Sequence, residues 1–201
     1  MRELADALAA AREGDEAGFT LLWRAYQPGL LRYLRVVVGA AAEDVASETW
    51  LQVARDLSGY RGGPEAFQVW LFRVARHRAI DDRRWVRRRP EELVDPALVP
   101  ERISGDAWTQ AVEHFDTEWA LAVIGSLPPD QAEAVLLRVV VGLDVAGTAA
   151  VLRKRPGAVR VAALRGLRRL AEHTEVRQRR PAVPSAVPEG GVTRWDSGTP
   201  G

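Results

Sequence analysis

The sequence predicts an all-α protein made of two small helical domains that an acidic flexible linker joins. Apolar residues recur at helical spacing along most of the chain, and runs with the two-residue period of strands are almost absent. The helical pattern fails between residues 90 and 117, where prolines and a Ser-Gly pair occur. The 201 residues, 47% hydrophobic and 27% charged, suffice for packed cores. We therefore expect domains at 1–89 and 118–175, a linker at 90–117 and a disordered tail at 176–201.

Amphipathic patterns predict the helices of the first domain. Phe19, Leu22 and Tyr26 share one helical face, after which Pro28 should kink or break the run. Two later apolar stripes, also at helical spacing, consist of Ala46, Trp50, Val53 and Leu57, and of Phe67, Trp70, Leu71, Val74 and Ala75. These stripes predict helices over residues 43–57 and 66–80. Because Trp23, Trp50 and Trp70 lie on apolar stripes, we expect them in the core.

The second domain is expected to contain four helices, whose ends are marked by capping and breaking residues. A short helix over 119–127 should end at a Pro-Pro pair. Asp130 and Glu133 have the spacing of a capping box, which should open a second helix. Gly142 should end that helix.

The last two helices have the pattern of a helix-turn-helix. Asp144 can cap a short helix that ends near Leu152, and Pro156 suits the first position of the final helix. On this final helix the residues expected to face inward are Val159, Ala163, Leu167 and Leu170. Its arginines fall elsewhere around the helix, so the second helix of the motif suits the major groove of DNA.

Charge is strongly segregated along the chain, although the net charge is only +1. Seven arginines fall within residues 76–89, beside several aromatic residues. Acidic residues then dominate from Pro90 to Glu118, against the single Arg102. A second basic block runs from Arg153 to Arg180. Two basic segments separated by an acidic one predict two binding sites for a polyanion.

Composition excludes several classes of site. The chain has no cysteine, so a disulfide framework and a thiolate zinc site are excluded, and three scattered histidines make no metal cluster. We expect no cofactor. No Gly-rich phosphate loop and no pairing of nucleophile with base is found, so we do not expect an enzyme. The absence of a signal peptide and of long apolar runs predicts a cytoplasmic protein without membrane contact.

Three segments, in order, resemble bacterial RNA polymerase sigma factors of the extracytoplasmic-function type. AEDVASETWLQVARDL resembles the segment of that family that docks on the clamp helices of the largest polymerase subunit. FQVWLFRVARHRAIDDRRWVRRR resembles the segment that opens and reads the minus-ten promoter element. SLPPDQAEAVLLRVVVGLDVAGTAAVLRKRPGAVRVAALRGLRRL resembles the domain that reads the minus-thirty-five element. The resemblance covers about residues 15 to 173.

The resemblance implies a transcription initiation factor and assigns residues to three surfaces. The minus-ten surface comprises Arg76, His77, Arg78, Asp81, Arg83, Arg84, Arg87 and Arg88. The minus-thirty-five surface comprises Lys154, Arg155, Arg160, Arg165 and Arg168. The polymerase surface comprises Glu43, Asp44, Glu48, Trp50 and Leu51. The implied partners are promoter DNA, core RNA polymerase through its clamp helices and the flap of its second-largest subunit, and an anti-sigma factor.

Three residues depart from the family pattern. His77 stands where the family usually has Asn, in the turn that pockets an extruded base. Thr148 replaces a more usual Ile or Val on the first helix of the helix-turn-helix, and Arg153 occupies a turn position where Gly is common.

Trp85, which lies among arginines, could cover the edge of the core or meet DNA.

Two other functions remain open from the sequence. An autonomous helix-turn-helix regulator would bind duplex DNA by itself, but it would not need the acidic docking segment from Glu43 to Leu51. A decoy that only binds an anti-sigma factor would not need the arginine clusters. We also expect the free protein to keep its two domains packed together, with its DNA-binding faces covered until polymerase separates them.

Overall fold

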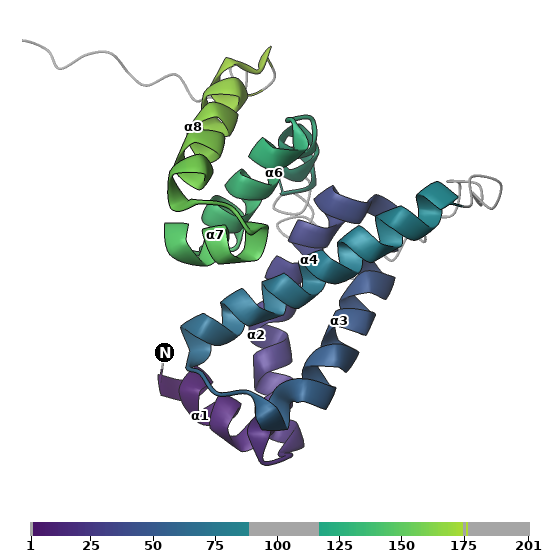
Figure 1. Ribbon diagram of the computed structural model, residues 1–201, viewed down its shortest axis with the longest axis vertical. Coiled ribbons are helices and arrows are strands. Elements are labelled where there is room, and N and C mark those ends of the chain that lie inside the picture. The colour runs from purple at the N-terminus through teal and green to yellow at the C-terminus, as the bar shows by residue number, and fades with distance from the viewer. Residues whose placement is uncertain (1, 89–116, 175, 177–201) are drawn as a thin grey trace, which may run out of the picture.

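The computed structural model describes residues 2–88, 117–174 and 176 of the chain (Figure 1). These residues form helices and turns without a strand, which confirms the all-α prediction. Nearly all of the predicted linker and of the predicted disordered tail lies outside the described residues. None of the described helices combines the length and the apolarity that crossing a membrane requires.

Four helices form the first module. They are α1 (Arg2–Arg12), α2 (Glu16–Val38), α3 (Ala42–Asp56) and α4 (Pro64–Arg88), with 3-10 turns η1 (Gly39–Ala41) and η2 (Leu57–Gly59) between the later ones. Helix α2 continues through Pro28, where a kink or a break was expected. Pro28 is exposed on the helix surface, so solvent can hydrate the carbonyl that lacks its helical N–H partner.

The core of the first module is aromatic and aliphatic. Its fully buried side chains include Leu22, Leu30, Tyr33, Leu34, Val53, Phe67, Leu71 and Phe72. The rings of Tyr33 and Phe72 meet edge to face at 5.6 Å, which joins α2 to α4. Trp50 is buried as expected, but Trp23 is 43% exposed, so its expected place in the core is wrong. Trp23 lies at the edge of the apolar stripe of α2, whereas Leu22 and Tyr26 lie at its buried centre.

The second module begins with a helix over 117–125. It continues through α6 (Pro129–Val135), the π-helical turn η4 (Leu136–Val140), α7 (Val145–Leu152) and α8 (Pro156–Glu172). Gly142 follows η4 with φ +81°, a conformation that glycine adopts without strain. The side chain of Asp144 accepts a 2.6 Å hydrogen bond from the Gly147 N–H, and Pro156 opens α8. Both predictions for the helix-turn-helix are confirmed.

The capping box predicted for α6 is absent. The helix starts at Pro129, one residue before Asp130, and no side chain caps its first turn. Asp130 pairs instead with Lys154 at 2.5 Å, and Glu133 pairs with Arg76 of α4 at 2.7 Å. Both carboxylates therefore bind cations distant in sequence rather than backbone N–H groups of their own helix.

One residue predicted to face inward on α8 does not. Leu167 is 45% exposed, whereas its neighbour Gly166 is buried. At 3.6 residues per turn, Gly166 lies almost directly below the buried Val159, and Leu167 is rotated away from that line. A Cβ on Gly166 would lie 2.7 Å from Val135 Cγ2, so only glycine permits this approach of α8 to α6.

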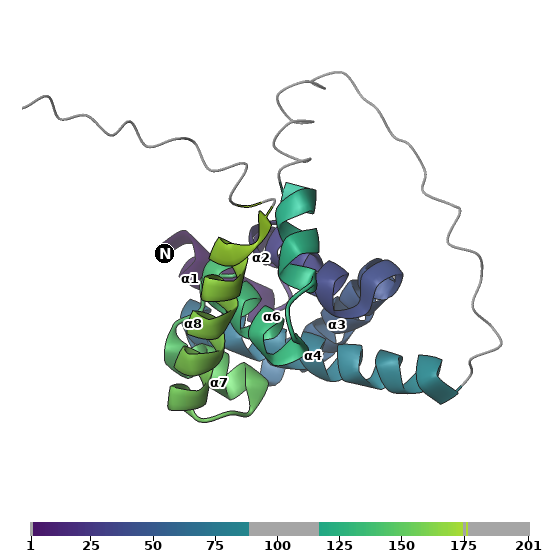
Figure 2. The same ribbon diagram turned by 90° about the horizontal axis from the view of Figure 1, so that it is seen from above.

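The two modules pack against each other (Figures 1 and 2). Helix α7 lies on α4, where a Cβ on Gly147 would come within 2.8 Å of Val69 Cγ2. The side-chain amide of Gln68 donates a 3.0 Å hydrogen bond to the carbonyl of Val141. A single cluster of buried apolar residues extends through both modules. The described structure is thus a closed arrangement of the two modules.

Replacing Thr148 by valine should stabilise the protein. Thr148 is fully buried in α7, and its hydroxyl has no hydrogen-bond partner among the described residues. Valine removes an unsatisfied polar group at nearly constant volume, so we expect the free energy of unfolding to rise by about 1 kcal/mol. Urea denaturation of the two proteins measures the difference. A less stable variant would show that the hydroxyl has a partner.

Candidate functional site

The predicted minus-ten residues lie along the second half of α4. Arg83 and Arg84 are exposed, and Arg87 and Arg88 belong to the last turn of the helix, where side chains are outside the described part. His77 was expected in a turn, but α4 runs without interruption through it. Its side chain is 69% exposed on the surface of the helix. The expected turn around His77 is therefore wrong, and this histidine lines no base pocket formed by a turn.

Asp81 lies beside two basic side chains of its own helix. Its carboxylate lies 3.4 Å from His77 Nδ1 and 3.8 Å from a guanidinium nitrogen of Arg84. Arg78 donates a 2.7 Å hydrogen bond to the side-chain oxygen of Gln52 on α3. A carboxylate repels phosphate, so Asp81 is better suited to hold these side chains in place than to contact DNA.

Arg76 lies at the junction of the two modules rather than on the open surface. Its Nε donates a 2.7 Å hydrogen bond to Glu133 of α6, and the two side chains are only 20% and 14% exposed. Burial lowers the pKa of Arg76, but the hydrogen bond and the charge of Glu133 outweigh it, so the pKa is raised. Arg76 therefore remains charged and is occupied by Glu133 in the closed arrangement.

Tyr33 adjoins this ion pair from α2. Its ring is fully buried, and its hydroxyl has no hydrogen-bond partner among the described residues. Burial, with a smaller contribution from Glu133, raises the pKa of Tyr33 far above its ordinary value. The phenol is therefore neutral, and it contributes apolar surface to the junction.

The predicted minus-thirty-five residues divide into two groups. Arg155, Arg160, Arg165 and Arg168 are exposed, at the start of α8 and along its length. Lys154 is partly buried and pairs with Asp130, so in this structure it links the turn of the helix-turn-helix to α6. These four exposed arginines give the helix-turn-helix a cationic surface.

The predicted polymerase-binding residues all lie on α3, and all but one of them are exposed. Glu43, Asp44 and Glu48 are exposed, and Leu51 is 58% exposed. Trp50 is only 6% exposed, and its indole N–H donates a 2.7 Å hydrogen bond to Gln27 of α2. A buried and hydrogen-bonded indole cannot contact a partner directly, so we remove Trp50 from this surface.

Sequence reasoning missed Trp23 as a surface residue. Phe19 and Gln27, one helical turn on either side of it, both contact Trp50. Trp23 therefore lies beside α3 while keeping 43% of its surface exposed. Exposed tryptophans are enriched among the residues that dominate binding at protein interfaces. The hydrophobic pattern could not distinguish Trp23 from the tryptophans of the core, because all of them lie on apolar stripes of their helices.

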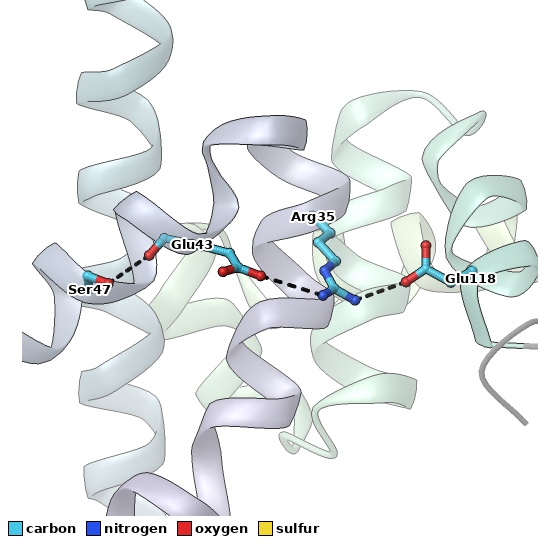
Figure 3. A network of polar contacts seen from close by, with 4 residues as sticks. All are labelled: Arg35, Glu43, Ser47 and Glu118. Carbon is cyan, nitrogen blue, oxygen red and sulfur yellow. Dashed lines mark hydrogen bonds and ion pairs between the residues drawn. The ribbon is translucent and has the colours of Figure 1, made fainter. Parts of the chain in front are cut away.

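Glu43 takes part in a polar network that reaches the second module. Arg35 of α2 lies 3.8 Å from a carboxylate oxygen of Glu43 and 2.9 Å from one of Glu118 (Figure 3). The Ser47 hydroxyl donates to the backbone carbonyl of Glu43 (Figure 3). Arg35 thus connects the start of α3 to the helix over 117–125.

The acidic face of α3 continues onto α4. Asp44, Glu48 and Asp82 line one cleft, together with Asp81, Arg78, Arg84 and Trp85. Desolvation raises the pKa of Asp82, and the nearby charges of Glu48 and Asp44 raise it further. Four carboxylates and two guanidinium groups line this cleft, and this excess of negative charge favours a basic partner.

Both modules match known protein families. The sigma-70 region 2 family matches residues 22–89, and the sigma-70 region 4 family matches residues 117–170. The chain is 34% identical over 173 residues to the ECF RNA polymerase sigma factor SigD of Mycobacterium tuberculosis, covering 82% of this chain and 81% of that protein. It is also 34% identical over 170 residues to the ECF RNA polymerase sigma factor ShbA of Streptomyces griseus, covering 80% and 89% respectively.

A solved structure shares the fold. The structure of CnrH in complex with the cytosolic domain of CnrY superimposes with a TM-score of 0.60 at 19% sequence identity. The similarity covers 85% of this chain and 96% of that one. At this identity it supports the helical fold alone.

Proposed function

The chain belongs to the sigma-70 family as an RNA polymerase sigma factor of the extracytoplasmic-function type, and we propose how its two modules divide promoter recognition. Such a protein initiates transcription by binding core RNA polymerase and directing it to promoter DNA. In the proposed division, residues 1–89 bind polymerase and the minus-ten element. Residues 118–175 bind the minus-thirty-five element.

The observation that carries this proposal is the placement of two cationic helices in separate modules. Arg83 and Arg84 are exposed on α4, and Arg160, Arg165 and Arg168 are exposed on α8. A duplex regulator needs one such helix for each half-site. Two unlike cationic helices, preceded in the chain by an acidic face on α3, fit two different promoter elements and a protein partner.

We assign strand capture at the minus-ten element to the cationic half of α4. Opening DNA loses base stacking, on the order of 1.4 kcal/mol per step. Arginines can offset this loss, because they neutralise phosphates and stack on extruded bases. Arg83, Arg84, Arg87 and Arg88 are the direct contacts, supported by His77 and Arg78. Asp81 positions its neighbours, and Arg76 joins this surface once Glu133 releases it.

We assign polymerase docking to Glu43, Asp44, Glu48 and Leu51, and we add Trp23. The exposed carboxylates attract a basic surface of the partner. The side chains of Leu51 and Trp23 provide apolar surface that becomes buried on binding. The exposed Val161, Leu164 and Leu167 of α8 offer a second apolar surface, which fits the polymerase flap or an anti-sigma factor.

The closed arrangement is the proposed resting state of the free protein. Arg76 cannot contact DNA while it is paired with Glu133, and α7 covers part of α4. Polymerase binding would separate the modules and release Arg76 and the part of α4 under α7. The arginines of α8 are already exposed in the closed arrangement, so the expectation that both DNA-binding faces are covered is wrong for α8.

Run-off transcription with purified core polymerase tests the proposed function. The template is the fragment upstream of the protein's own gene, and a discrete transcript that requires this protein is the expected result. A sequence-specific shift of duplex DNA without polymerase, together with no transcript, would instead favour an autonomous regulator.

Replacing Arg165 by alanine should relax the preference for the minus-thirty-five sequence. An arginine that binds guanine with two hydrogen bonds contributes about 1–3 kcal/mol of discrimination, or roughly 5- to 150-fold in affinity. The comparison variant is Arg83→Ala, which should weaken binding to all promoters alike and reduce the salt dependence by about one phosphate contact. Binding of the holoenzyme to promoters with altered minus-thirty-five or minus-ten elements measures the effects of both variants. Equal losses on every sequence for both variants would contradict this division.

A further inference from the structure

A cationic cleft of about 460 Å³ lies between α4 and the end of α7. Its basic lining residues are Arg73, Arg76, His77, Arg78 and Arg153, and no carboxylate lines it among the described residues. Trp70, Val74 and Val151 give it an apolar wall. The volume lies in the range of roughly 300–1,000 Å³ that is usual for small-molecule sites. Because Arg153 and Val151 belong to the second module, the cleft exists only in the closed arrangement.

Two of these basic side chains, those of Arg73 and Arg153, have neither an ion pair nor a side-chain hydrogen bond in the described part of the chain. Arg76 is paired with Glu133, Arg78 is bound to Gln52, and His77 faces Asp81. For Arg73 and Arg153, no ion pair joins either to another residue in the described part of the chain. Like charges that converge on one cleft repel each other, so an anion bound between them would be stabilised.

The backbone of Arg153 supplies an independent indication. It has φ +54° and ψ +43°, and among the described residues it alone has a positive φ without being glycine. This left-handed conformation costs an L-residue roughly 1–2 kcal/mol, and glycine usually occupies it at the end of a helix. Non-glycine residues in such conformations cluster at ligand sites. Here the strained residue is Arg153, which has no ion pair or side-chain hydrogen bond among the described residues.

We infer that this cleft binds a nucleoside polyphosphate, with its phosphates on Arg73 and Arg153 and its base against Trp70 and the apolar wall. Guanidinium groups bind phosphate through two parallel hydrogen bonds. One face of the Trp70 indole stacks on Tyr60 at 4.9 Å, which leaves the other face for a base. A ligand held by both modules stabilises the closed arrangement, since it binds only that state. If the proposed function holds, the nucleotide therefore opposes promoter binding.

Isothermal titration of the free, full-length protein tests the site without polymerase. The probes are ATP, adenosine and inorganic tripolyphosphate, together with a thymidine dodecamer as single-stranded DNA. We expect ATP to bind more tightly than either of its parts. Arg73→Ala and Arg153→Gly should each weaken ATP binding by roughly tenfold or more, equivalent to ~1.4 kcal/mol. Arg153→Gly keeps the fold, because glycine favours the backbone conformation found there.

Two further variants sharpen the test. Arg169→Ala changes an exposed arginine of α8 that does not line the cleft, so ATP binding should stay unchanged. Val69→Glu places a charge where α4 meets Gly147, so it should open the modules, which small-angle scattering would show as a larger radius of gyration. ATP binding should be lost in this variant, whereas binding of the dodecamer should remain.

Several results would overturn the inference. They are no heat of binding with ATP, equal ATP affinity in wild type and in both cleft variants, and tripolyphosphate binding as tightly as ATP. ATP binding that survives the opening of the modules in Val69→Glu would also overturn it. Failure of run-off transcription would refute the proposed function but would leave the measured nucleotide affinity standing, so the two failures are distinguishable.

Discussion

Core-dependent transcription should fall by roughly 100-fold when Glu48 is replaced by arginine, because like charges opposed at an interface cost several kcal/mol. Glu48 is exposed on α3, within the acidic face that it shares with Asp44 and Asp82. A basic partner surface attracted by that field would meet a cation instead. The main effect should appear in the affinity for core polymerase rather than in the binding of DNA.

The fold should survive this change, which makes the result interpretable. Glu48 is one of the charges that raise the pKa of Asp82, so an arginine there replaces a repulsion with an attraction. The free energy of unfolding should therefore stay the same or rise slightly.

Run-off transcription and a polymerase-binding titration measure the effect of Glu48→Arg. The matched control is Glu13→Arg, the same change at an exposed residue in the turn between α1 and α2, outside the candidate face. It should transcribe as the wild type does. Full activity of Glu48→Arg would remove α3 from the polymerase surface, and equal loss in both variants would attribute the effect to net charge.

Replacing Gly166 by alanine should destabilise the second module by about 1–3 kcal/mol, the usual cost of forcing extra volume into a packed site. The added Cβ would lie 2.7 Å from Val135 Cγ2 and 3.4 Å from the backbone oxygen of Gln131. Both groups belong to α6, so α8 would have to move away from it. The arginines of α8 would move with the helix, and affinity for the minus-thirty-five element should fall.

Gly157→Ala is the matched control, because it makes the same change in the first turn of the same helix. A Cβ there meets nothing within 4 Å. Alanine should therefore leave stability unchanged or raise it by up to about 1 kcal/mol through the helix preference of alanine over glycine. Thermal and urea unfolding of the two variants give the comparison. Equal stability of both would mean that α6 and α8 do not approach as closely as described.

Much of the helix-turn-helix could be predicted from the sequence, because its boundaries depend on local chemistry. Asp144 caps α7 through a backbone N–H three residues away, and Pro156 has the φ that the first residue of a helix requires. Gly142 ends the preceding turn through a backbone conformation that it adopts freely. Each signal involves residues within one turn, so no distant partner could change it. The arginine clusters on α4 and α8 were equally visible, because charged side chains stay near the surface.

The surroundings of individual side chains required the tertiary structure. Asp130 and Glu133 have the spacing of a capping box, yet Lys154 and Arg76 are stronger partners for their charges than backbone N–H groups. Trp23 follows an apolar stripe, but the packing of α2 against α3 buries Trp50 and leaves Trp23 at the rim. Local spacing determines which face of a helix a residue occupies. Only the approach of the other helices decides whether that face is covered, and which residues distant in the chain meet its charges.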